Sequence, residues 1–124
     1  MRIKESAENY LETILMLKNK NGYVRSIDIA NELGFTKASV SVAMKSFREE
    51  GYITVDEHGT ISLTQKGIEI AEKIYERHKI IAKLFINLGV SEEVAYEDAC
   101  KIEHDISNES FNVIKKYLTD NNLL

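Results

Sequence analysis

The sequence predicts a mainly α-helical chain with a single β-hairpin near its middle. Apolar residues recur at helical spacing in six stretches, whereas strict alternation of apolar and polar residues is clear only in residues 52–63. The chain contains no proline, so regular helices can run long. Its 124 residues and 44% hydrophobic content suit one compact unit or two small ones.

The first helix is expected from Ala7 to about Lys20, with Ser6 as its N-cap. The other helices are expected at residues 27–33, 37–50, 65–88, 92–104 and 108–118. Their predicted N-caps are all small hydroxyl residues: Ser26, Thr36, Thr64, Ser91 and Ser107. The tail from Thr119 to Leu124 is expected to fray.

The hairpin is expected to pair residues 52–55 with 60–63 around the turn Asp56-Glu-His-Gly59. Tyr23 to Arg25 is long enough only for an edge strand. Helix, short strand, helix, tight turn, helix and hairpin is the order of elements in a winged helix-turn-helix. The link Gly34-Phe-Thr36 has the length that a helix-turn-helix uses. We therefore expect this fold in the first half of the chain.

Composition limits the class of protein. No apolar run approaches the ~18 residues that a membrane span needs, and we expect no signal peptide. The single cysteine cannot form an internal disulfide, which fits a reducing cytoplasm. Residues 1–63 hold eight Lys/Arg against nine Asp/Glu, and residues 64–124 hold eight against eleven. The net charge of -4 argues mildly against nucleic-acid binding, but a near-neutral half beside an acidic half suggests DNA for the first and a cation for the second.

The start of the predicted second helix of the helix-turn-helix carries short side chains, which let a helix end enter the major groove. Thr36 and Ser39 can donate to phosphates, and Lys37 can neutralise one. The candidate DNA-binding residues are Arg25, Thr36, Lys37, Ala38, Ser39, Ser41, Lys45 and His58. The alternative is that Thr36 only caps the helix and the lysines are solvated. No Arg, Asn or Gln stands at the helix start to read a base, so the operator is not identified.

Cys100, Glu103 and His104 are spaced i, i+3 and i+4, so one helix face would present a thiolate, a carboxylate and an imidazole. This mixed set suits a first-row transition metal better than calcium or magnesium. The alternative is that Cys100 is a small core residue and the other two belong to a solvated face.

A second group of possible ligands lies elsewhere in the chain. Asn9 and Glu12 are spaced i, i+3 on the first helix, and His78 lies midway along the longest one. The alternatives are a first-turn cap for Asn9 and a hydrogen-bonded core histidine for His78.

The chain resembles the diphtheria-toxin-repressor family of iron- and manganese-dependent regulators, from Ser6 to about Leu118. The motifs that carry the resemblance are Glu8-Asn-Tyr-Leu-Glu12, Leu63-Thr-Gln-Lys-Gly67, Arg77-His78 and Asp98-Ala-Cys-Lys-Ile-Glu-His104.

The resemblance implies a metal-dependent transcriptional repressor and no enzyme. It would bind operator DNA as a homodimer, paired through the helices after residue 90, when Fe(II) or Mn(II) is bound. Residues 1–63 would form the winged helix-turn-helix, and residues 64–124 the connecting helix with the metal-binding and dimerisation domain. We also expect the chain to lack the SH3-like third domain of the iron-type members, in which it would resemble the smaller manganese-type proteins.

The metal site that the resemblance implies consists of Asn9, Glu12, His78, Cys100, Glu103 and His104. Cys100 is the choice of iron-type members, whereas manganese-type members have a carboxylate there. Glu12 and His78 match the manganese-type pattern, and Asn9 departs from both. We therefore expect Fe(II) as the first choice of metal and Mn(II) as the second.

The positions of the iron-type ancillary ligands carry Ala82 and Tyr96, so that second site is expected to be broken in its iron-type form. Three other functions remain open from the residues alone. One is a winged-helix regulator that is independent of metal or senses a small molecule. Another is a small metallohydrolase with Glu103 or Glu12 as base, and the third is a thiol sensor through Cys100.

Overall fold

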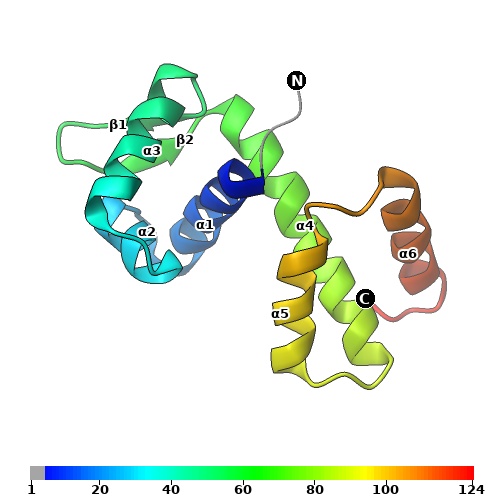
Figure 1. Cartoon of the computed structure of the whole chain (residues 1–124). Coiled ribbons are helices and arrows are strands. Elements are labelled where there is room, and N and C mark those ends of the chain that lie inside the picture. The colour runs from blue at the N-terminus through cyan, green and yellow to red at the C-terminus, as the bar shows by residue number, and fades with distance from the viewer. Residues whose placement is uncertain (1–4) are drawn as a thin grey trace. The chain divides into compact units, whose positions relative to one another are not determined.

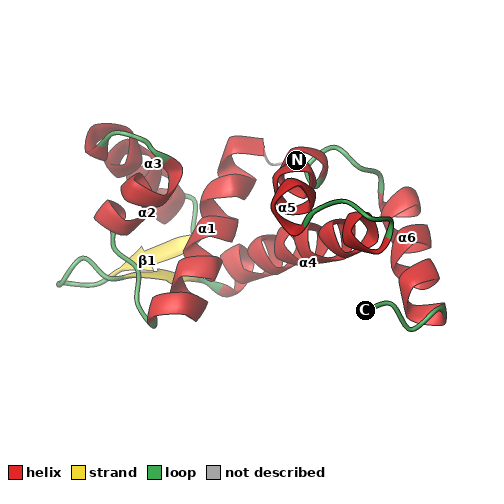
Figure 2. Ribbon diagram, turned by 90° about the horizontal axis from the view of Figure 1, so that it is seen from below, coloured by secondary structure: helices red, strands yellow, loops and turns green. Residues whose placement is uncertain are grey.

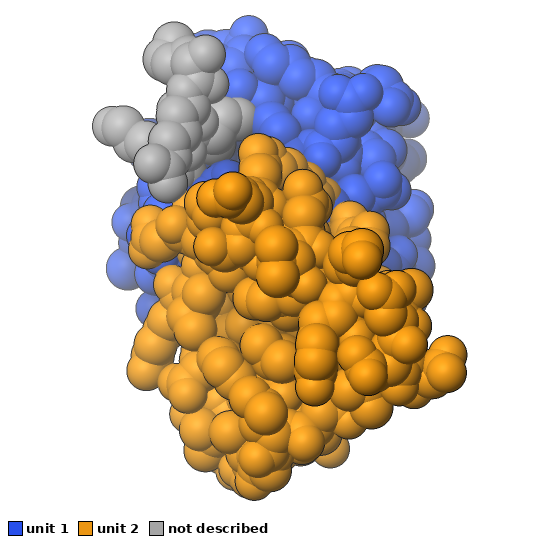
Figure 3. Space-filling view, turned by 90° about the vertical axis from the view of Figure 1, so that its right-hand side faces the viewer, with its two compact units in different colours: residues 1–72 blue, residues 73–124 orange. Residues whose placement is uncertain are grey.

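The computed structural model describes residues 5–124 as six helices and two short strands, which confirms the mainly α-helical class (Figure 1). The elements in chain order are α1 (Glu5–Asn21), α2 (Ser26–Leu33), α3 (Lys37–Glu49), β1 (Ile53–Val55), β2 (Ile61–Leu63), α4 (Gln65–Asn87), α5 (Glu92–Ile102) and α6 (Asn108–Asp120). The chain divides into two compact units, residues 1–72 and residues 73–124 (Figure 3). None of the helices within residues 5–124 combines the length and apolar character that a membrane crossing needs.

Unit 1 (residues 1–72) contains a winged helix-turn-helix, the fold that the sequence predicts for the first half of the chain. Helices α2 and α3 are joined by a tight turn in which Gly34 adopts a left-handed conformation, with φ of 70°. Thr36 then caps α3, because its Oγ1 accepts a hydrogen bond from the Ser39 N–H at 3.1 Å. The core of the unit is apolar and is drawn from all its elements: Tyr10, Leu11, Ile14, Leu17, Val24, Ile29, Ala30, Val40, Met44, Phe47, Ile53, Ile61 and Ala71.

Two predicted N-caps in unit 1 are wrong by one or more residues. Helix α2 begins at Ser26, and the cap position is taken by Arg25, whose backbone N–H donates to Asp28 Oδ2 at 2.9 Å. The carboxylate of Asp28, at the third position of the helix, therefore accepts from the backbone N–H of the cap residue Arg25. Helix α1 already includes Ser6; residues 1–4 lie outside the described part of the chain.

The wing is an antiparallel pair of strands (Figure 2), in which Ile53 lies opposite Leu63 and Val55 opposite Ile61. Tyr23 to Arg25 do not form the expected edge strand. One backbone hydrogen bond, from the Ile61 N–H to the Val24 carbonyl at 2.7 Å, joins this stretch to β2. Val24 is fully buried, so it contributes to the core rather than to a ladder.

The Leu63-Thr-Gln-Lys-Gly67 stretch attaches the start of α4 to the backbone that precedes β1. Thr64 Oγ1 donates to the Gly51 carbonyl at 2.6 Å and accepts from the Gly67 N–H at 3.2 Å. A Cβ placed on Gly67 would lie 2.1 Å from the Tyr52 carbonyl oxygen. Only glycine lets the helix approach the backbone of the preceding turn so closely.

Unit 2 (residues 73–124) packs the second part of α4 with α5 and α6. Small residues at the α4–α5 contact, Ala82, Ala95 and Ala99, are buried together with Ile81. Ile80, Phe111 and Leu118 form a second cluster, against which Leu123 also packs.

The expected fraying from Thr119 onward is wrong for most of the tail. Helix α6 continues to Asp120, and the Leu123 N–H donates to the Leu118 carbonyl at 2.9 Å. The tail is held because Leu123 also buries apolar surface against the second cluster of unit 2.

Candidate metal centre and candidate nucleic-acid surface

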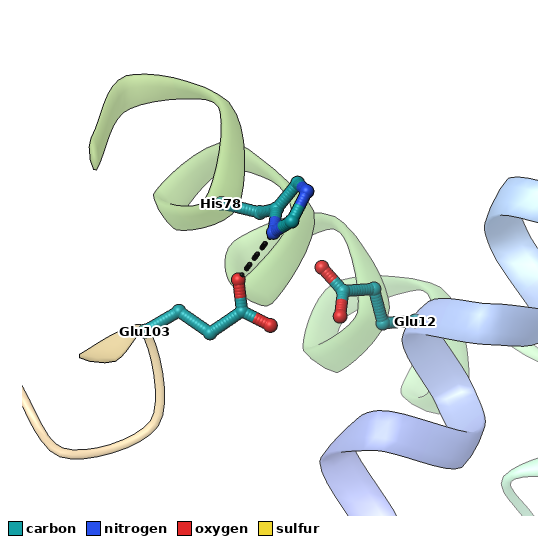
Figure 4. A group of neighbouring side chains, drawn as sticks. All are labelled: Glu12, His78 and Glu103. Atoms are coloured by element: carbon teal, nitrogen blue, oxygen red, sulfur yellow. Dashed lines mark hydrogen bonds and ion pairs between the residues drawn. The ribbon is translucent and has the colours of Figure 1, made fainter. Parts of the chain in front are cut away.

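The centre of the candidate metal site in unit 2 is the pair His78 and Glu103. His78 projects from α4, and its Nδ1 lies 2.8 Å from Glu103 Oε2 (Figure 4). The ring of Tyr96 from α5 stacks on the imidazole, with 5.4 Å between the ring centroids. The imidazole is therefore held between a carboxylate and an aromatic ring.

Glu103 is fully buried, with 0% of its surface exposed. Its second oxygen, Oε1, makes no hydrogen bond to any described residue, although His104 Nε2 lies 3.4 Å away. A buried carboxylate oxygen without a hydrogen bond is costly unless a positive charge compensates it. The combination of carboxylate oxygen and imidazole nitrogen therefore fits a divalent transition metal.

The inner face of α5 explains why Glu103 is buried. Ala95 and Ala99 lie four residues apart on that face, and Glu103 is the next position in the same row. The helix ends at Ile102, two residues earlier than predicted, but the Glu103 N–H still donates to the Ala99 carbonyl at 2.9 Å. Glu103 therefore keeps the helical direction beyond the last full turn.

The expected common face of Cys100, Glu103 and His104 is only partly present. Glu103 and His104 are buried, whereas Cys100 is exposed. Cys100 follows Ala99 directly, so it is rotated by about 100° away from the buried row. Unit 2 thus brings His78, Glu103 and His104 together and leaves the thiol on the surface of α5.

The remaining predicted ligands lie in unit 1, on α1. Asn9 is half-buried, and Glu12, the third side chain labelled in Figure 4, is 4% exposed. A nearly buried glutamate among the mostly apolar buried residues of α1 is unusual for a structural role alone.

Two further positions bear on the iron-type ancillary site. Ala82 is fully buried in the α4–α5 contact and offers no ligand atom. Tyr96 stacks on His78 instead.

The candidate nucleic-acid surface in unit 1 is the outer side of α3. Lys37, Ala38, Ser41 and Lys45 are all exposed there. Thr36 is exposed as well, although it also caps the helix and its Oγ1 donates to Ser39 Oγ at 2.9 Å. The single proton of the Thr36 hydroxyl is thus donated to Ser39 Oγ, so a hydrogen bond from Thr36 to a phosphate would replace that one, whereas the Ser39 hydroxyl has its own proton to donate.

The turn of the wing is ordered by Asp56. Its Oδ1 accepts from the backbone N–H groups of His58 at 2.8 Å and Thr60 at 2.9 Å. The Thr60 hydrogen bond, with that of His58, lowers the pKa of Asp56 against a weaker opposing effect of desolvation. The fixed turn leaves the His58 side chain exposed, and Arg25 is exposed near the start of α2.

Two large apolar residues of unit 1 are exposed to solvent. Phe35 is 49% exposed, although its ring lies 5.7 Å from that of Tyr10. Val42 on α3 is 71% exposed, and it is not among the candidate DNA-binding residues chosen from the sequence. Its spacing could have identified it, because Val42 is four residues from Ala38 and three from Lys45 and therefore shares their outer face of the helix.

The comparisons with known families cover nearly all of the chain. Residues 2–60 match the family described as iron dependent repressor, N-terminal DNA binding domain. Residues 64–122 match the iron dependent repressor, metal binding and dimerisation domain.

Similar proteins are transcriptional regulators. An uncharacterised HTH-type transcriptional regulator of Methanocaldococcus jannaschii is 35% identical over 118 residues, which cover 94% of each chain. The HTH-type transcriptional regulator MntR of Lysinibacillus sphaericus is 31% identical over 109 residues, 88% of this chain and 78% of that protein. The crystal structure of T. acidophilum IdeR has the same fold, with a TM-score of 0.83 at 24% identity; the match covers 96% of this chain and 55% of that one.

Proposed function

Because the chain belongs to the diphtheria-toxin-repressor family of metal-dependent transcriptional repressors, we propose that it binds operator DNA as a homodimer when Fe(II) or Mn(II) occupies its metal site. Members of this family are regulators and not enzymes. The observation that carries the proposal is the buried Glu103 carboxylate, whose Oε1 has no hydrogen bond among the described residues and whose Oε2 meets His78.

We assign the ligands to both units of the chain. The set is Asn9, Glu12, His78, Cys100, Glu103 and His104. A cation held by Glu12 of α1 and by His78 and Glu103 couples the DNA-reading unit to the unit of the dimerisation domain. If the cation binds the conformation that is competent to bind DNA more tightly than it binds other conformations, it increases the fraction of the protein in that conformation.

The choice of metal follows from the chemistry of the donors. The Cys100 thiolate is softer than a carboxylate and favours Fe(II), whereas the Glu12 and Glu103 oxygens keep Mn(II) in competition. Affinity alone rises from Mn(II) through Fe(II) along the divalent series, so Fe(II) is the first choice and Mn(II) the second.

The DNA-binding step uses α3 and the wing. Lys37 and Lys45 would neutralise phosphates, Thr36 and Ser39 would donate to them, and Ala38 and Ser41 would lie against base edges. Arg25 and His58 would add contacts to the backbone and the minor groove.

Pairing of two chains supplies the second recognition helix. Two such helices reach successive major grooves when they lie about 34 Å apart. Unit 2 has exposed apolar side chains that suit a two-fold interface: Val94, Val113 and Tyr117. The two-fold interface would set the spacing, and the metal would hold each DNA-reading unit against it.

The test is a selection from random duplex DNA at fixed salt and under anaerobic conditions. The protein is incubated with a chelator, Fe(II), Mn(II) or Zn(II), and the recovered DNA is sequenced. We expect a palindromic site to be enriched with metal and much weaker binding with chelator. Equal enrichment in all conditions, or a monomer in sedimentation at micromolar concentration with metal, would contradict the proposal.

A further inference from the structure

Arg77 is a buried cation with three hydrogen bonds to the segment that follows α5. It lies on α4 directly before His78 and is 6% exposed. Its Nη1 donates to the Glu103 carbonyl at 3.1 Å and to the Ile106 carbonyl at 2.7 Å. Its Nη2 donates to Asn108 Oδ1, and its guanidinium lies 5.5 Å from the centre of the Phe111 ring.

All three acceptors of Arg77 are neutral oxygens, and its Nε makes no hydrogen bond to a described residue. Burying a charge in this way is costly, because no carboxylate is among the hydrogen-bond acceptors to offset the loss of water. Apolar packing alone would be served better by an aliphatic side chain. The arrangement therefore points to a task that needs several donors in one plane.

That task concerns residues 103–108, the turn between α5 and α6. The turn carries Glu103 and His104, and it begins at Glu103, the C-cap of α5, whose N–H is the donor of a hydrogen bond to the Ala99 carbonyl. Arg77 holds the main chain of Glu103 from α4, and His78, one residue later, holds its carboxylate. One turn of α4 thus fixes both the backbone and the side chain of the same residue.

We propose that Arg77 is a positioning residue of the metal site. It holds the turn 103–108 so that the ligand atoms of Glu103 and His104 are already in their binding positions before the metal ion binds. The inference deepens the proposed function and rests on it. A site held in its binding geometry loses less conformational freedom when the cation binds, and therefore binds it more tightly.

The experiment is an anaerobic titration of the full chain with Co(II), followed by its visible absorption and by competition with Mn(II). Arg77→Met keeps the length of the side chain and removes every donor, while Arg77→Lys keeps the charge and loses the fork. We expect Arg77→Met to weaken Co(II) binding by at least about tenfold, the loss typical of an outer partner of a metal ligand. The Co(II) spectrum should change with it, and Arg77→Lys should fall between Arg77→Met and the wild type.

Leu118→Ala is the control for lost packing, because it opens a cavity in the α4–α6 cluster but removes none of the hydrogen bonds from Arg77 to the turn. It should lower the unfolding temperature and leave the Co(II) affinity and spectrum unchanged. Wild-type affinity and spectrum in both Arg77 variants would overturn the positioning role, as would an equal loss in Leu118→Ala. A wild-type chain that binds neither Co(II) nor Mn(II) would instead overturn the proposed function itself.

Discussion

The imidazole of His78 and the carboxylate of Glu103 are joined by a 2.8 Å contact between Nδ1 and Oε2, although the residues are 25 positions apart in the chain. The contact depends on the packing of α4 against α5, where the alanine row leaves room for the two side chains to meet. Two groups that ordinarily ligate transition metals are thereby placed together in a buried setting.

Glu103→Gln should separate metal binding from folding. The variant loses the charge but keeps the shape, so Mn(II) and Co(II) affinity should fall by more than about 100-fold, beyond the loss of an outer partner. Stability in the presence of chelator should not fall, because a buried ionised carboxylate is costly. Calorimetric metal titration and urea unfolding measure the two effects. Glu109→Gln, an exposed position on α6, serves as control; metal affinity within a few-fold of wild type in Glu103→Gln would exclude Glu103 as a ligand.

Lys37→Ala should weaken binding to every duplex and lower the slope of log affinity against log salt by about one unit, because it removes one phosphate contact. Lys116→Ala removes an exposed charge from unit 2 and should leave the slope unchanged. Fluorescence anisotropy over a salt series with metal present gives both slopes. An unchanged slope in Lys37→Ala would show that this lysine is only solvated.

Cys100 should set the preference among metals. Cys100→Glu provides the harder ligand of the manganese-type pattern and should strengthen the Mn(II) response relative to Fe(II). Cys100→Ala should weaken binding of every thiophilic metal. Metal-dependent DNA binding is compared anaerobically for the three proteins. If the order of metals is the same in all of them, the exposed thiol is not a ligand.

Gly67→Ala should destabilise unit 1. The added Cβ would meet the Tyr52 carbonyl oxygen at 2.1 Å, so α4 must shift from the wing, at a cost of roughly 1–3 kcal/mol in the free energy of unfolding. Glu72→Ala, an exposed position on the same helix, should cost little. Urea unfolding of the metal-free proteins measures the difference. Equal stability of the two variants would mean that the helix start adapts freely.

Local pattern determined the elements and most of their ends. Apolar spacing located all six helices, and Thr36, Thr64, Ser91 and Ser107 cap helices as predicted, because a hydroxyl acceptor acts within one turn of its own position. Helical spacing and the family resemblance together identified His78, Glu103 and His104 as candidate metal ligands.

Other features depended on contacts between segments far apart in the chain. Cys100 is exposed because α4 covers the row of Ala95 and Ala99 and not its neighbour, and spacing along one helix does not show which face a partner helix will cover. The tail is ordered because Leu123 finds apolar surface near Leu118. Arg77 was visible in the sequence only as part of a motif. Its role depends on three acceptors that lie 26 to 31 residues away and are gathered by the tertiary fold around one guanidinium.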